Sequence, residues 1–179
     1  AALYASSYMS IQRWNYWDNQ GEPISETLAV AEALERIMSK DLSHPGVLHL
    51  HIHLIEASAE PERALVAADN LEKTIPIVGH VVHMPSHIYV RVGQYQKAVE
   101  QNIRSQKVDK EFAEIWGDLP LPNLGTYPLS HKIHSGHALD FVRYAASVQG
   151  NYDLASKSAW TMANSIKDNQ IMIMQGQKR

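Results

Sequence analysis

Small and β-branched residues recur in this chain at a spacing of 34 residues, and this period constrains the fold more than any other feature. Val30, Ala64 and Ala98 lie 34 residues apart, each at a position typical of helix packing. Between residues 24 and 40, apolar side chains recur every three or four positions, which predicts an amphipathic helix rather than a strand. A period of this length with two helices per unit is typical of proteins in which neighbouring repeats stack on a shared core.

The expected secondary structure is a succession of helix pairs. The predicted helices are 24–40, 47–57, 60–76, 77–92, 95–114, 131–148 and 152–166. We expect Ser25 to cap the first helix and Pro85 to kink the fourth, because proline removes a backbone hydrogen bond. His44, in the turn before the second helix, is a further candidate cap.

These helices predict an all-α fold, a superhelical solenoid of antiparallel helix pairs that forms a single domain over residues 1–179. The expected repeat units are about 11–43, 44–76, 77–114 and 131–168, with a Pro-rich insertion loop at 115–130 and a tail at 169–179. Because the chain opens without an initiator Met, we expect a fragment of a longer protein. The compartment is not identified, and a periplasmic or secreted location stays open.

Composition excludes several classes of protein. Hydrophobic residues make up 45% and charged residues 20% of the chain, as in ordinary globular proteins. A net charge of -3 without a basic run argues against nucleic-acid binding. The long uncharged stretch at 74–90 is interrupted by His and Pro, which excludes a membrane span there. The absence of Cys excludes disulfides, thiolate zinc sites, iron–sulfur clusters and Cys nucleophiles.

The ten histidines are the most informative chemical feature. His49 and His53 lie four residues apart on one predicted helix, and His83 and His87 repeat this spacing 34 residues later. Side chains four residues apart share one face of a helix, so such a pair can bind one metal ion. The common offset indicates that stacked repeats bring the two pairs together.

Several further residues lie near these pairs in the sequence or on the same helix faces. The expected metal ligands are His49, His53, Glu56, His83, His87, His134 and His131. His131, His134 and His137 spread over about 120° of a helix, so all three cannot share one ion. Additional candidates for a groove beside the site are His80, Tyr89, Arg91 and His137. Nitrogen and oxygen ligands of this kind suit Zn, Cu, Fe, Ni or Mn.

Two motifs carry a resemblance to a known family. One is HPGVLH at 44–49, followed by Ile52-His53 and Glu56; the other is HMPSHIY at 83–89, followed by Arg91. With the 34-residue period, the chain resembles tetratricopeptide (TPR) repeat proteins, in particular a His-rich bacterial group. The resemblance implies a TPR superhelix that carries the His motifs, and it implies no specific reaction. This chain has Lys132 where the pattern of that group has Asn.

Two classes of function follow. The first is a metal-binding TPR protein whose site is structural or catalytic; in the catalytic form Glu56 acts as a base, while Tyr89 or Arg91 orients a substrate. The alternative for Arg91 is a salt bridge. The second class is a scaffold that binds a protein or peptide partner, or copies of itself, without an essential metal. Whether the protein is an enzyme stays open.

An aromatic cluster near the N-terminus has two interpretations. Trp14, Tyr16 and Trp17 lie close together in the sequence. They either pack under the first repeat or line a groove, and we favour packing.

Overall fold

The computed structural model describes residues 2–116 and 131–165. The regular secondary structure of these residues consists of helices joined by turns and loops, with one isolated bridge between Trp17 and Pro23. The predicted all-α class is therefore confirmed. The elements are α1 (Ala2–Gln12), α2 (Thr27–Met38), α3 (Pro45–Ile55), the 3-10 turn η1 (Pro61–Ala64), α4 (Leu65–Thr74), α5 (Gly79–His83), α6 (Pro85–Arg91), α7 (Tyr95–Trp116), α8 (His131–Val148) and α9 (Tyr152–Ser165).

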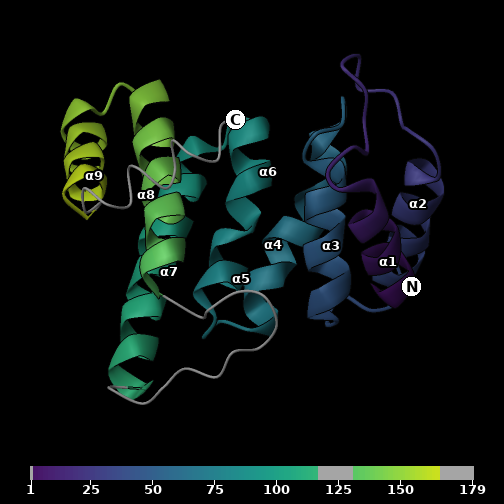
Figure 1. The fold of residues 1–179 in the computed structure, drawn as a ribbon, viewed down its shortest axis with the longest axis horizontal. Helices are drawn as coiled ribbons and strands as arrows, with labels where there is room; N and C mark the ends of the chain where they lie inside the picture. The colour runs from purple at the N-terminus through teal and green to yellow at the C-terminus, as the bar shows by residue number, and fades with distance from the viewer. Residues whose placement is uncertain (1, 117–130, 166–179) are drawn as a thin grey trace.

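The helices follow one another along the longest axis of the molecule. Figure 1 shows α1–α3 at one end, α8 and α9 at the other, and α4–α7 between them. Helices next to each other in the chain pack together, as α2 does on α3 and α8 does on α9. The elements α2, η1 and α7 begin at Thr27, Pro61 and Tyr95, so the 34-residue period of the sequence also separates these three starts.

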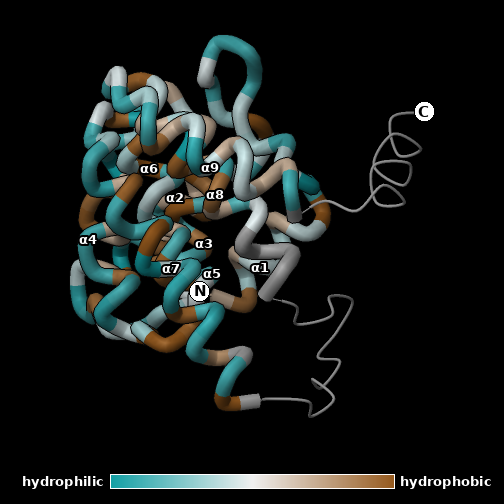
Figure 2. The backbone as a smooth tube through the Cα atoms, turned by 90° about the vertical axis from the view of Figure 1, so that its left-hand side faces the viewer, coloured by the Kyte–Doolittle hydropathy of each residue, from teal (hydrophilic) through white to brown (hydrophobic). Residues whose placement is uncertain are grey.

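A continuous apolar core connects the helices. Leu34, Ile52, Leu71 and Ile88 are fully buried members of this core and come from α2, α3, α4 and α6. Figure 2 shows hydrophobic and hydrophilic stretches interleaved along the helices, as expected where each helix buries one face. Within the described residues, no helix is both long and apolar enough to span a membrane.

The start of α2 differs from the prediction. Ser25 does not cap the helix: its φ is 53°, and the residue at the cap position is Glu26, whose side chain makes no capping hydrogen bond. The Thr27 hydroxyl instead lies within hydrogen-bond distance of the Ile24 carbonyl, at 2.7 Å, and of the Tyr8 hydroxyl, also at 2.7 Å. This buried contact with α1 favours a helix start at Thr27, three residues after the expected start at residue 24.

The expected interruption at Pro85 is present, and it divides the helix expected at 77–92 into α5 and α6, which meet where Pro85 lacks a backbone N–H. One helix was missed. Helix α1 was not expected, because its apolar residues form no clear stripe; Ala5 and Met9 are nevertheless buried against α2 and α3.

The expected cap at His44 is tested by the structure, whereas most of the expected loop and tail are not. The N–H of Val47 donates to Nδ1 of His44 at 3.4 Å, which confirms His44 as the cap of α3. Most of the expected insertion loop and all of the expected tail lie outside the described residues (117–130 and 166–179). Those two segments stay predictions.

The core makes a direct stability prediction. Leu34→Ala removes a fully buried side chain from α2, and we expect the free energy of unfolding to fall by about 2–5 kcal/mol. Leu28, on the same helix, is 42% exposed, and Leu28→Ala serves as the matched control with an expected change below about 0.5 kcal/mol. Urea denaturation of both variants measures the difference, and equal losses would contradict the assigned core.

Candidate metal centre

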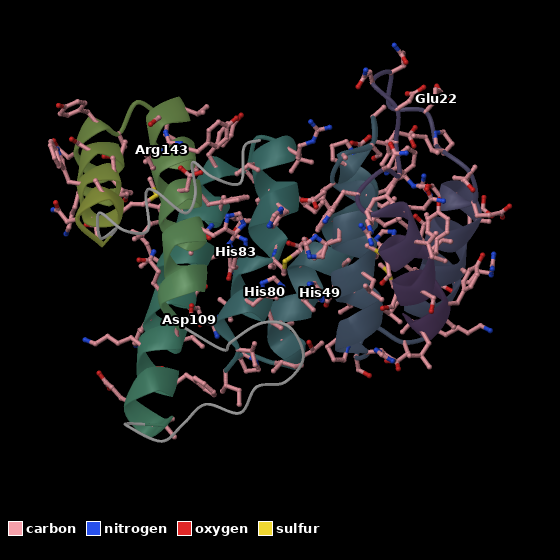
Figure 3. The ribbon with its side chains drawn as sticks, in the orientation of Figure 1. Glu22, His49, His80, His83, Asp109 and Arg143 are labelled. Carbon is pink, nitrogen blue, oxygen red and sulfur yellow. The ribbon has the colours of Figure 1, made fainter. Side chains whose placement is uncertain are left out.

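Histidines from α3, α5, α6 and α8 meet in the middle of the molecule. Figure 3 shows His49, His80 and His83 in the middle of the molecule, with Glu22 away from them at one end. Among the residues that the structure describes, two groups have ligand atoms that all lie within 4.8 Å of one another: triad 1 is His49, His53 and His80, and triad 2 is His83, His87 and His137.

Triad 1 joins α3 to α5. His49 and His53 lie one turn apart on α3, with their ring centroids 4.8 Å apart. His80, from α5, places its Nε2 atom 3.1 Å from Nε2 of His49. The triad therefore combines the predicted pair on α3 with a residue from α5.

Triad 2 lies across the break at Pro85. His83 ends α5 and His87 belongs to α6, and their Nε2 atoms lie 2.9 Å apart. His137 approaches from α8, with its ring centroid 4.7 Å from that of His83. Three helices thus contribute to one cluster of imidazoles.

The carboxylate of Glu56 lies between the triads. The residue caps the C-terminus of α3. Its Oε1 lies 3.1 Å from Nδ1 of His53, and its Oε2 lies 2.5 Å from Nδ1 of His87. One carboxylate therefore orients a ring in each triad, as carboxylates behind metal-bound histidines do.

Asn102, on α7, orients the ring of His83 in a similar way. Its Nδ2 donates to the Ser86 hydroxyl at 2.8 Å and to the Ala98 carbonyl at 2.7 Å. These two acceptors fix the amide so that Oδ1 faces Nδ1 of His83, at 2.6 Å. Because Oδ1 only accepts, Nδ1 of His83 carries the hydrogen.

This pattern fixes the chemistry of triad 2. Nδ1 of His83 donates to Asn102, and Nδ1 of His87 donates to Glu56. In a neutral imidazole the second nitrogen then carries a lone pair, so the two Nε2 atoms face each other as acceptors 2.9 Å apart. The pair therefore needs a cation between the two Nε2 atoms, and this cation is either a proton on one ring or a metal ion.

The pKa values of Glu56 and His49 are both lowered by their surroundings. Burial alone raises the pKa of Glu56, but hydrogen bonds from His53 and His87 outweigh it and bring the pKa to about 2. Burial, with the charges of His53 and His87, lowers the pKa of His49 to about 4. At neutral pH, Glu56 is therefore an anion and His49 is neutral and able to bind a metal.

The two triads are neighbours. The ring centroids of His53 and His87 lie 5.7 Å apart, and those of His80 and His83 lie 6.3 Å apart. His80 and His83 come from the same short helix yet belong to different triads. The arrangement can thus place two metal ions close to each other, with the anion of Glu56 between their ligands.

The structure brings both predicted pairs together, but in separate triads. Glu56, expected among the ligands, lies outside both triads, and its oxygens are used by Nδ1 atoms. His80 and His137, expected only as groove residues, complete the triads. The side chains of His131 and His134 lie outside the described residues, and their role stays a prediction.

The side chains of Tyr89 and Arg91 form hydrogen bonds with residues outside the triads. The Tyr89 hydroxyl donates to Asp69 at 2.7 Å, and Nη2 of Arg91 donates to the Ser58 carbonyl at 2.8 Å. The carbonyl of Ser58 thus takes the place of the acidic partner considered for Arg91. Sequence reasoning missed Asn102, since a lone Asn on a predicted helix gives no signal until α7 is packed against α5 and α6.

Comparison with known proteins provides no relative: no family model, curated protein or solved structure matches the chain. The interpretation of the site therefore rests on its own geometry.

The role of Glu56 is testable by an isosteric change. Glu56→Gln keeps the shape but forces the amide NH₂ toward one of the two Nδ1 atoms, where it cannot accept a hydrogen bond. We expect zinc affinity, measured by competition with a chelator, to fall by about 10- to 100-fold. Glu32→Gln, at an exposed position of α2, is the control and should leave affinity unchanged. Unchanged affinity in Glu56→Gln would contradict the orienting role.

Proposed function

We propose that this protein binds transition metal ions, one at each His triad. The observation that carries the proposal is the 2.9 Å approach of the Nε2 atoms of His83 and His87, whose Nδ1 hydrogens are already committed. Two acceptors held this close need a cation between them.

The geometry suits a metal ion as well as a proton. A proton shared between the two rings would place a positive charge beside the fully buried His83, with the anion of Glu56 as its counter-ion. Metal–nitrogen bonds of about 2.0–2.1 Å place two ligands of one ion about 3.0–3.4 Å apart. The approaches of 2.9 Å in triad 2 and 3.1 Å in triad 1 lie close to this range.

The donor set narrows the choice of metal. Imidazole nitrogen suits Zn, Cu, Fe and Ni, whereas Mn prefers oxygen ligands. Because both oxygens of Glu56 accept from histidines, the triads offer nitrogen alone. We infer Zn or Cu as the first choice. Three histidines with one exchangeable position are the arrangement of catalytic rather than structural zinc sites, and such a position binds water or a substrate.

We further propose that the helix pairs form a TPR-like superhelix. The resemblance of the motifs and the 34-residue spacing of helix starts support it. In that arrangement α3 and the α5–α6 segment are equivalent helices of adjacent repeats, which explains why their histidines meet. The scaffold function without a metal stays a prediction, since it rests on the repeat resemblance alone.

Metal content provides the main test. We expect the metal-free protein to take up close to two equivalents of zinc per chain, measured by elemental mass spectrometry without a His tag. His49→Ala should remove the ion of triad 1, and His83→Ala the ion of triad 2. His44→Asn removes a histidine outside both triads while keeping a side chain that caps α3, and it should retain both ions.

Two results would contradict the proposal. One is a wild-type protein that takes up no Zn or Cu. The other is equal metal content in wild type, His49→Ala and His83→Ala, which would place any bound ion elsewhere. Circular dichroism of each variant checks that the helices are retained.

A further inference from the structure

An open hollow of about 420 Å³ lies beside triad 1, between α1 and α3. Met9, Leu50 and Trp14 contribute apolar surface to it, and Arg13 contributes a cation. The hollow is open to solvent, and its lining combines apolar side chains with a few polar groups, as the linings of small-molecule sites do.

Triad 1 and the hollow share His53. The ring of His53 lines the hollow, and its centroid lies 5.0 Å from that of Trp14 in an edge-to-face contact. Trp14 is nevertheless 63% exposed, whereas Trp17 donates its Nε1–H to the Leu54 carbonyl at 2.6 Å. The aromatic cluster is thus divided: Trp17 packs on α3, and Trp14 remains available to a ligand.

The backbone at this place is strained. Arg13 and Trp14 follow α1 with φ values of 48° and 70°, in the left-handed region that favours glycine. Such strain costs about 1–3 kcal/mol per residue and is concentrated at functional sites. Arg13 also makes no ion pair within residues 2–116 and 131–165, so its charge is available to a ligand.

We propose that this hollow binds a small organic carboxylate. The carboxylate pairs with the Arg13 guanidinium, and the apolar body lies on Trp14, Met9 and Leu50, beside His53. The inference goes beyond the proposed metal binding and does not depend on a bound ion. It assigns a function to the exposed Trp14 and to the unpaired Arg13, which the metal centre leaves unexplained.

Calorimetric titration with phenylacetate tests the proposal. We expect saturable binding to the wild-type protein, both metal-free and zinc-loaded, and a loss of about tenfold or more in Arg13→Gln. Arg36→Gln, at an exposed arginine of α2, is the matched control and should bind as wild type does. Phenylacetamide, which lacks the charge, should bind the wild type at least about tenfold more weakly than phenylacetate.

Tryptophan fluorescence shows where phenylacetate binds. Phenylacetate should change the tryptophan fluorescence of the wild type and of Trp160→Phe, an exposed position on α9, but not of Trp14→Phe. The proposal is overturned if millimolar phenylacetate does not bind the wild type, or if Arg13→Gln binds it equally well. Metal uptake is measured separately, so binding that depends on Arg13 in metal-free protein supports this site even if the metal centre fails.

Discussion

The carboxylate of Glu56 is the group on which the arrangement of the centre depends. Glu56 is the residue at the C-terminal cap of α3, and its carboxylate accepts hydrogen bonds from His53 in triad 1 and from His87 in triad 2. Nε2 of His87 then faces Nε2 of His83, and Nε2 is the nitrogen of His53 that the bond to Glu56 does not use. Asn102, on α7, accepts a hydrogen bond from His83 in the same way. The arrangement of the histidines is therefore built by hydrogen bonds behind the rings, where α3, α6 and α7 contribute Glu56, His87 and Asn102.

The fold was predictable to the extent that it follows from periodicity. The 34-residue spacing predicted the helix pairs, and elements do begin at Thr27, Pro61 and Tyr95. Local capping was less predictable: Ser25 has the right chemistry for a cap, but the buried Thr27–Tyr8 contact decides where α2 starts. Helix α1 has no amphipathic stripe in the sequence, because its burial comes from small and aromatic residues that contact other helices.

The site was predictable in its pairs but not in its triads. Spacing along one helix places His49 beside His53, since it depends only on helix geometry. The third member of each triad depends on how helices pack, and no spacing indicates that His80 turns to α3 while His83 turns toward α8. The contact of Trp14 with His53 is also tertiary, and it joins the metal centre to a hollow that the sequence alone does not show.

X-ray absorption at the zinc edge of the loaded protein is the sharpest test of metal binding by the two triads, because it reports the atoms bound to the ion. We expect a first coordination shell dominated by imidazole nitrogen at about 2.0–2.1 Å, with the multiple-scattering signature of histidine and no carboxylate of Glu56. A shell dominated by oxygen would contradict it, because the two triads would then not be what holds the metal.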